Sequence, residues 1–359
     1  MPAKRTVLIA LSAMVASLGL AVPAASEAFY KGKTLRIIVG TEAGGTADIL
    51  VRTFSVYLKR HLPDNPTIVV QNVTGAGGNL AFNFVAEKVD PDGLTIIYSP
   101  YHPLAQALGD RSLRVRYQDF EFLGGNADIR INYMRTDAVS GGARKPSDVM
   151  KANNIVVGAF NHTDFSGALA HLSLDVLGVP HKLVLGYRGG ADVFLAMQRN
   201  EVQFHNTSIG TFRTRSAAFV RSGEAIGIAY LVAVAPDGAF TRSDDIGEMP
   251  AFPDLYREVH GKMPSGPAWE ALNWLTQQCG ELLYAGFAPR GAPPAAIAEL
   301  RRAFAAAATD PVFVSEAAAR NGIPYSYVDV AHGSAVIRAL ADVSPQVLTT
   351  LRSAIGSPN

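Results

Sequence analysis

The stretch "GTEAGGTADILVR" at residues 40–52 lies between an apolar run at 35–39 and a segment with helical periodicity. In that segment, Val51, Phe54 and Leu58 recur at a spacing that a helix brings to one face. A glycine-rich loop between a strand and a helix is typical of α/β units. The stretch therefore predicts the first unit of an α/β sheet.

A second stretch, "NVTGAGGNLAF" at 72–82, repeats this arrangement after an apolar run at 67–71. A short helical pattern follows, and then the turn "DPDG" at 90–93 leads into a strand expected at 94–98. Such a β-α-β-α-β run predicts a parallel sheet with helices on both faces. Ligands of these sheets bind beyond the carboxyl ends of the strands, where both glycine loops lie.

The alternation restarts at residue 155, after a stretch at 140–148 that we interpret as a linker or an exposed loop. We expect the remaining strands at 155–158, 182–185, 202–205, 225–231 and 282–288, and helices at about 166–177, after 189–190 and at 295–308. The 359 residues suit two domains, each large enough to bury its own core. The fold class is therefore α/β with two units.

The N-terminus has the pattern of a secretory signal. Lys4 and Arg5 precede a weakly polar run at 6–22 and a small-residue stretch at 23–28, so we expect cleavage near Ala28 and export to the periplasm. The alternative is a membrane anchor, but the run is short for a span and has no charged stop-transfer flank.

The charge balance and the cysteine content exclude several classes of protein. Without residues 1–28, which carry Lys4, Arg5 and Glu27, the chain has as many acidic as basic residues, which argues against nucleic acid or an anionic membrane as a partner. Cys279 is the only cysteine, so the chain forms no intramolecular disulfide, and we expect a core thiol.

The glycine loops suit an anion but match no nucleotide motif. Neither ends in the Gly-Lys-Ser/Thr of a P-loop, and Leu80 stands where the third Rossmann glycine belongs. Gly44-Gly45 and Gly77-Gly78 still allow backbone N–H groups at a helix start to approach a carboxylate or phosphate closely. The alternative is that these glycines serve only as tight strand-to-helix turns.

Side chains beside the glycines have expected roles at the two helix starts. Thr46 and Asn79 are candidate N-caps. Asp48 falls in the first turn of its helix, where we expect it to cap or orient the loop rather than bind an anion itself.

Two loops of the second unit lie in corresponding positions. "GAFNHTDFSG" at 158–167 supplies the uncharged hydrogen-bonding residues Asn161, Thr163 and Ser166, and "GYRGGAD" at 186–192 supplies Arg188. The planar guanidinium of Arg188 suits a carboxylate, and the alternative is a solvated surface arginine.

The chain lacks the motifs of common catalytic and metal sites. His162 and Asp164 have no third ligand at a recognisable spacing, so we predict no metal site. Ser208 in "HNTSIG" lacks the first glycine of a nucleophile elbow, and no partner His and Asp are indicated. We therefore predict that the protein is not an enzyme.

Together, the signal-like N-terminus, the two glycine loops, "YRGGADVFLAMQRNEVQF" at 187–204 and "APRGAPPAAIAELRRAF" at 288–304 resemble the tripartite tricarboxylate transporter receptors, or Bug family. The resemblance implies a type II periplasmic-binding-protein fold, in which two α/β lobes clamp a small carboxylate. It also implies a monomer that needs no cofactor and delivers its ligand to integral membrane subunits of a tripartite transporter.

The resemblance also implies a ligand site built from four loops, at 41–48, 75–79, 160–166 and 187–190. The residues it assigns to ligand binding are Thr41, Glu42, Ala43, Gly44, Gly45, Thr46, Asp48, Gly75, Ala76, Gly77, Gly78, Asn79, Asn161, Thr163, Ser166, Tyr187, Arg188 and Gly189. Glu42 departs from the family pattern, which has an apolar or aromatic residue there. If Glu42 faces the cleft, it repels a carboxylate and favours a neutral, cationic or amino-bearing ligand.

We expect one lobe to comprise 29–127 and 236–359 and the other to comprise 128–235, with crossings near 125–130 and 232–238. The function that this organisation favours is capture of a small organic acid outside the cytoplasm for a membrane transporter. The alternatives are an exported ligand sensor for a signalling partner and an exported enzyme on the same scaffold.

Overall fold

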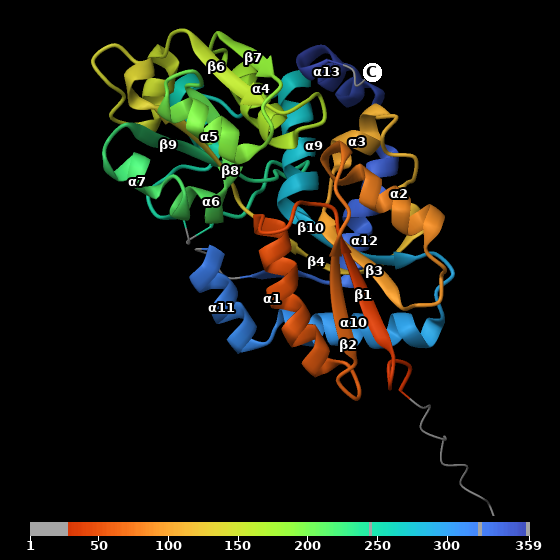
Figure 1. The fold of residues 1–359 in the computed structure, drawn as a ribbon. Helices are drawn as coiled ribbons and strands as arrows, with labels where there is room; N and C mark the ends of the chain where they lie inside the picture. The colour runs from red at the N-terminus through yellow and green to blue at the C-terminus, as the bar shows by residue number, and fades with distance from the viewer. Residues whose placement is uncertain (1–27, 244–245, 322–324, 357–359) are drawn as a thin grey trace, which may run out of the picture.

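The computed structural model describes residues 28–243, 246–321 and 325–356. The predicted targeting segment lies outside these ranges except for Ala28. The described residues form two sheets, each flanked by helices (Figure 1). Within these ranges, no helix combines the length and the apolar character that a membrane span requires.

The first sheet has the strand order β11-β4-β10-β3-β1-β2. Its strands are β1 (Thr34–Val39), β2 (Thr67–Asn72), β3 (Thr95–Pro100), β4 (Phe120–Ala127), β10 (Tyr284–Pro289) and β11 (Ser326–Val328). Strand β1 pairs in parallel with β2 and β3, which confirms the predicted parallel run. Strand β10 is antiparallel to β3 and β4, and β11 is antiparallel to β4.

Helices cover both faces of the first sheet. On one face lie α1 (Thr46–His61), α10 (Pro294–Ala308) and α11 (Pro311–Asn321), and on the other lie α2 (Asn79–Lys88), α3 (Pro103–Leu108) and α12 (Val330–Ala339). Val51, Phe54 and Leu58 of α1 are fully buried, as their spacing predicts. The ring of Phe54 lies 4.5 Å from that of Phe304 on α10, measured between centroids. The apolar stripe of α1 therefore fixes the direction in which the preceding glycine loop leaves β1.

The second sheet has the strand order β7-β6-β8-β5-β9. Its strands are β5 (Arg130–Arg135), β6 (Ile155–Ala159), β7 (His181–Leu185), β8 (Phe204–Ser208) and β9 (Ala225–Leu231). Strand β6 runs parallel to β7 and β8, whereas β5 is antiparallel to β8 and β9. One face carries α5 (Gly190–Gln198), α6 (Ile209–Thr214) and α7 (Ala217–Arg221), and the other carries α4 (Phe165–Leu177).

Three later helices pack on the α4 face of the second sheet. These are α8 (Phe252–His260), α9 (Pro267–Glu281) and α13 (Pro345–Ile355), and their buried residues join one apolar cluster with those of α4 and β6. Figure 1 shows α13 beside α4, although the two helices are far apart in the sequence. Cys279 lies in this cluster as a buried free thiol.

The chain passes from the first sheet to the second between Ala127 and Arg130, where a crossing is expected from the sequence. The return differs from the expected position at 232–238, because α8 and α9 still pack with the second sheet and the chain re-enters the first sheet at β10. The lobe boundaries remain a prediction, and this packing favours a return near Leu282 and Leu283. The apolar residues of α4 that α8 and α9 contact are distant in the sequence, so periodicity alone did not indicate this packing.

Candidate functional site

The four predicted loops meet around one cavity of ≈ 440 Å³, which we call the loop cavity. The loops after β1 and β2 form one wall, and the loops after β6 and β7 form the facing wall. Since β1 and β2 are parallel, as are β6 and β7, their loops leave each sheet at the same edge.

Most of the predicted ligand-binding residues line this cavity. They are Thr41, Glu42, Gly75, Ala76, Gly77, Gly78, Asn79, Asn161, Thr163, Ser166 and Arg188. Other predicted residues belong to the same loops but are not among the lining residues, namely Ala43, Gly44, Gly45, Thr46, Asp48, Tyr187 and Gly189. Ligand contact by any of them remains a prediction.

Asp48 holds the first loop in shape. Its Oδ2 accepts a hydrogen bond from Gly44 N at 2.8 Å, and Arg52 forms an ion pair with it at 2.9 Å. Asn72 donates to Asp48 Oδ1 at 2.9 Å and to the carbonyl oxygen of Thr41 at 2.8 Å. Burial alone would raise the pKa of the Asp48 carboxyl, but the hydrogen bonds from Arg52, Gly44 and Asn72 together outweigh it and lower the pKa. As expected from the sequence, Asp48 orients the loop.

The two helices begin one residue earlier than predicted. The N-cap positions are Gly45 and Gly78, and neither has a side-chain capping bond, so the prediction that Thr46 and Asn79 are N-caps is wrong. The physical reason is that glycine at the cap lets the backbone turn tightly. It also leaves the first N–H groups of the helix open, because it has no side chain that could accept their hydrogen bonds.

The second loop is a run of left-handed backbone. Gly75, Ala76, Gly77 and Gly78 have φ values of 129°, 48°, 65° and 105°. A Cβ added to Gly77 would meet no heavy atom within 4 Å, so this position faces open space in the cavity. A Cβ on Gly78 would lie 3.3 Å from both Gly40 O and His102 Nε2. The loop therefore requires glycine for conformation at Gly77 and also for close approach at Gly78.

Three side chains of the loop cavity hold a buried polar atom that has no hydrogen-bond partner among the described residues. These atoms are Thr41 Oγ1, Asn79 Oδ1 and His102 Nε2. Burial lowers the pKa of His102 to about 4, so its ring is neutral at pH 7. Leaving a buried polar atom unpaired costs about 1–3 kcal/mol, so three such atoms in one cavity indicate a place for a polar ligand or for water.

The third loop is supported from behind by a buried arginine. Asp164 N-caps α4 and accepts hydrogen bonds from Ser166 N at 2.9 Å and Phe160 N at 3.1 Å. Burial raises the pKa of Asp164 to about 6. Arg130, which is 4 % exposed, donates to Ser166 Oγ at 2.8 Å and lies over the ring of Phe165. A positive charge thus lies directly behind this wall of the cavity.

Arg188 in the fourth loop is open to solvent. Its side chain is 89 % exposed, with Nη2 3.6 Å from Asp192 Oδ1. Tyr187 instead packs beneath the loop in the apolar cluster of α5, and burial raises the pKa of its hydroxyl. Thr163 Oγ1 in the third loop donates to Asp110 Oδ2 at 3.4 Å, in the segment that follows α3.

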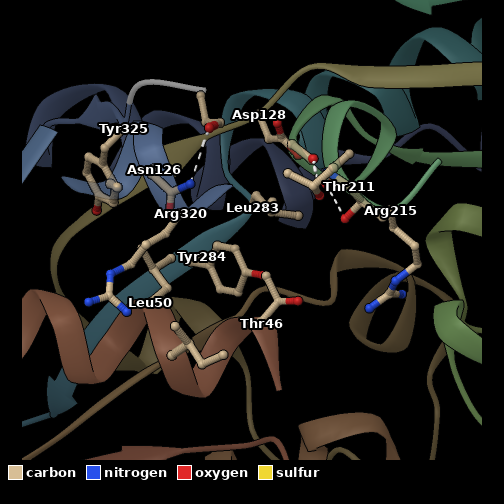
Figure 2. A pocket seen from close by; sticks show the side chains of 16 residues that line it. Thr46, Leu50, Asn126, Asp128, Thr211, Arg215, Leu283, Tyr284, Arg320 and Tyr325 are labelled. Atoms are coloured by element: carbon tan, nitrogen blue, oxygen red, sulfur yellow. Dashed lines mark hydrogen bonds between the residues drawn. The ribbon is translucent and has the colours of Figure 1, made fainter. Parts of the chain in front are cut away.

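A second cavity of ≈ 350 Å³ lies at the crossing between the sheets, and we call it the hinge cavity (Figure 2). Thr46 lines this cavity together with Asp128, Arg215 and Tyr284. Asp128 is 8 % exposed, its Oδ2 has no partner among the described residues, and burial raises its pKa to about 7 against the effect of Arg130. This cavity therefore offers a buried carboxyl oxygen without a partner, whereas Asp164, the buried carboxyl group of the loop cavity, is hydrogen-bonded to backbone N–H groups.

Comparison with known proteins shows which proteins share the fold of this chain. A UPF0065 (Bug family) protein from Bordetella pertussis is 25 % identical over 296 residues, which is 79 % of each chain. A TctC solute binding protein from Polaromonas superposes with a TM-score of 0.63 at 19 % identity, over 89 % of this chain and 98 % of that one. The structural neighbours of this chain are TctC and Bug periplasmic binding proteins.

A Rhodopseudomonas palustris protein of the same fold, solved with adipate, gives a TM-score of 0.65 at 19 % identity, over 89 % of this chain and 97 % of that one. No protein-family model matches the chain. The two-lobed fold of the periplasmic solute-binding proteins, expected from the sequence, is thereby confirmed.

Sequence reasoning missed several residues around the cavity of this solute-binding fold. Thr74, Pro100 and His102 line it but lie outside the four predicted ranges. His102 follows β3 directly, and β3 is parallel to β1, so the rule that sites form at the carboxyl ends of parallel strands was the signal that could have indicated it. Arg130 begins β5, and its place behind the third loop had no sequence signal.

Proposed function

We propose that this chain is an extracytoplasmic receptor that captures a small organic acid and delivers it to a tripartite tricarboxylate-type membrane transporter. The observation that carries the proposal is the loop cavity, where glycine loops from both sheets surround Thr41, Asn79 and His102 with their unpartnered polar atoms. The adipate bound by the R. palustris neighbour supports a carboxylate as the ligand class.

The walls suggest how such an acid is held. A carboxylate group accepts hydrogen bonds from backbone N–H groups at the helix start after Gly78, and Arg188 adds a charge-assisted bond when the walls approach. A hydroxyl or second carboxyl group of the ligand meets the free polar atoms of Thr41 and His102. Because Glu42 also lines the cavity, a mono- or dicarboxylate fits better than a tricarboxylate.

The groups around the cavity suit capture rather than catalysis. Ser166 Oγ is held by Arg130, and the pKa of His102, at about 4, makes it a weak base without a nucleophile bonded to its Nε2. We therefore infer a non-enzymatic receptor, exported with cleavage near Ala28, that acts as a monomer and binds integral membrane subunits. The approach of the two walls on binding is part of this proposal.

The test is isothermal titration of the purified protein with a panel of C3–C6 dicarboxylates and hydroxy acids, with the neutral amide of each acid as its matched control. We expect one saturable site that takes an acid and rejects its amide. Failure of every acid, or equal affinity for an amide, would contradict a carboxylate receptor. Small-angle scattering with the bound acid should show a smaller radius of gyration.

A sensor role is distinguished in cells. Deleting the gene should abolish uptake of the labelled acid if the protein serves a transporter. If uptake persists and only the transcriptional response to the acid is lost, the receptor serves a signalling partner.

A further inference from the structure

Two histidines and an aspartate converge at the end of the second sheet farthest along α4 from the loop cavity. His171 and Asp175 lie one turn apart on α4, a spacing that brings both side chains to the same face of a helix. The helix ends at Gly178 in the left-handed conformation, and the chain turns directly into β7, whose first residue is His181. This short turn places His181 beside the other two.

The distances among the three side chains are short. His181 Nε2 lies 2.6 Å from His171 Nδ1, and His171 Nε2 lies 3.4 Å from Asp175 Oδ2. His181 Nε2 also lies 3.8 Å from Asp175 Oδ1. One ligand atom from each residue falls within 4.8 Å of the others. Among the described residues, this is the group of three His, Cys, Asp or Glu side chains that meets this distance.

The N–H groups of the two histidines are too few for the hydrogen-bond acceptors around them. His181 Nδ1 lies 2.8 Å from the carbonyl oxygen of Val179, which only accepts, so Nδ1 carries the proton and Nε2 of the neutral ring presents a lone pair to the group. His171 then faces acceptors on more than one side, namely His181 Nε2, Asp175 and the carbonyl oxygen of Ala354 on α13. A neutral imidazole has one N–H and cannot serve all of them.

A positive charge resolves this arrangement. A divalent cation accepts lone pairs from both rings and from the carboxylate at once, because one ligand atom of each residue lies within 4.8 Å of the others.

We propose that His171, Asp175 and His181 bind a divalent late first-row metal ion, with Zn²⁺ as the reference case. Two imidazoles and one carboxylate are a common ligand set for Zn²⁺, and the fourth position is left to water. The hydrogen bond from His181 to Val179 fixes the ring in the way that supporting carbonyls do at metal sites.

The exposures of the side chains allow an ion to enter. The side chains of His171 and His181 are 13 % and 4 % exposed, whereas that of Asp175 is 38 % exposed. The imidazoles are thus held by packing, and the carboxylate is free to close over an ion from the solvent side. Two nitrogens bound to one Zn²⁺ at about 2.0–2.1 Å lie farther apart than 2.6 Å, so binding requires a small rotation of one ring.

The experiment is calorimetric titration of the tag-free, EDTA-treated protein with ZnCl₂ at pH 7.5, and with MgCl₂ as the ion that prefers oxygen ligands. We expect one Zn²⁺ per chain and no saturable Mg²⁺ binding. His181→Ala should weaken Zn²⁺ binding at least a hundredfold, and Asp175→Asn about tenfold. His332→Ala is the matched control, because His332 pairs with Glu281 without a third ligand in the described structure, and it should bind Zn²⁺ as the unaltered protein does.

Absence of a one-to-one Zn²⁺ isotherm, or unchanged affinity in His181→Ala, would overturn the proposal. A spectroscopic measurement on the unaltered protein keeps the test independent of how the variants fold. Co²⁺ titration should give the visible absorption of a tetrahedral site with nitrogen ligands, and Zn²⁺ should displace it. A spectrum identical to that of hydrated Co²⁺ would equally contradict the site.

Discussion

The loop cavity and the hinge cavity are similar in volume, at ≈ 440 and ≈ 350 Å³, but their walls differ in chemistry. The loop cavity combines left-handed glycines with unpartnered neutral atoms such as His102 Nε2. The hinge cavity has the buried carboxyl group of Asp128, whose Oδ2 has no partner among the described residues, and two arginines, Arg215 and Arg320. The buried carboxyl group of the loop cavity, Asp164, instead accepts hydrogen bonds from backbone N–H groups. A carboxylate ligand is therefore expected to choose between them by backbone access and charge, not by size.

The largest expected effect is at Gly77, in the loop cavity. Gly77→Val should abolish measurable binding of the cognate acid, at least a hundredfold loss, because the side chain would fill ligand space and strain a backbone at φ 65°. Titration calorimetry measures the loss, and circular dichroism checks the fold. Gly223→Val is the matched control, since Gly223 has φ 79° and open space around it but lies outside the four loops and does not line the cavity. Normal binding by Gly77→Val would mean that the second loop is only a turn.

The next largest effect compares one arginine of the loop cavity with one arginine of the hinge cavity. Arg188→Ala removes one charge-assisted hydrogen bond from the loop cavity and should weaken binding by about ten- to a hundredfold. Arg215→Ala removes one of the two arginines that line the hinge cavity, the other being Arg320, and should leave the affinity within about twofold. The same calorimetric titration compares them. The reverse order of effects would move the ligand to the hinge cavity.

Asp128 should give the hinge cavity a pH-dependent stability. Burial raises its pKa from 3.8 to about 7, so its stabilising contribution is complete below pH 4 and is lost as pH rises through 7. Asp128→Asn should therefore gain stability relative to the unaltered protein between pH 5 and pH 8, on the order of 2 kcal/mol. Thermal unfolding across this pH range measures the gain. A constant difference between the two proteins would show that Asp128 does not titrate there.

The smallest expected effect is at Glu42, whose side chain is exposed at the rim of the loop cavity. Glu42→Gln should tighten binding of a dicarboxylate by about two- to fivefold at low salt, because it removes a screened repulsion. The gain should shrink as salt is raised in the titration. If Glu42→Gln instead weakens binding, Glu42 contacts a donor on the ligand, and an amino-bearing acid becomes the better candidate.

The sequence predicted what depends on local pattern. The β1-loop-α1 unit and its repeat at β2 follow from apolar runs, helical periodicity and paired glycines, and they gave the parallel pairing and two of the four loops that line the loop cavity. What it missed depends on contacts between distant segments. Arg130 reaches Ser166 across the sheet, and α8 and α9 bury their apolar faces against α4. Neither has a sequence signal, because periodicity shows that a face is apolar but not which surface covers it.

The cluster of His171, Asp175 and His181 illustrates the same limit. The i, i+4 pair on α4 was readable as one face of a helix, but the third member comes from the next strand, after the turn at Gly178. The expectation of no metal site rested on His162 and Asp164. In the structure, Asp164 caps a helix and His162 contacts the carbonyl oxygen of Ile355 on α13.

The burial of Cys279 has a practical consequence for watching the two walls move. The thiol is 1 % exposed, and burial raises its pKa, so it is a poor target for maleimide dyes at neutral pH. Cysteines introduced at exposed positions on helices that flank different sheets, for example Lys88→Cys on α2 and Leu195→Cys on α5, would therefore be labelled above a silent background. Energy transfer between the two dyes could follow opening and closing in single molecules without first replacing the native thiol.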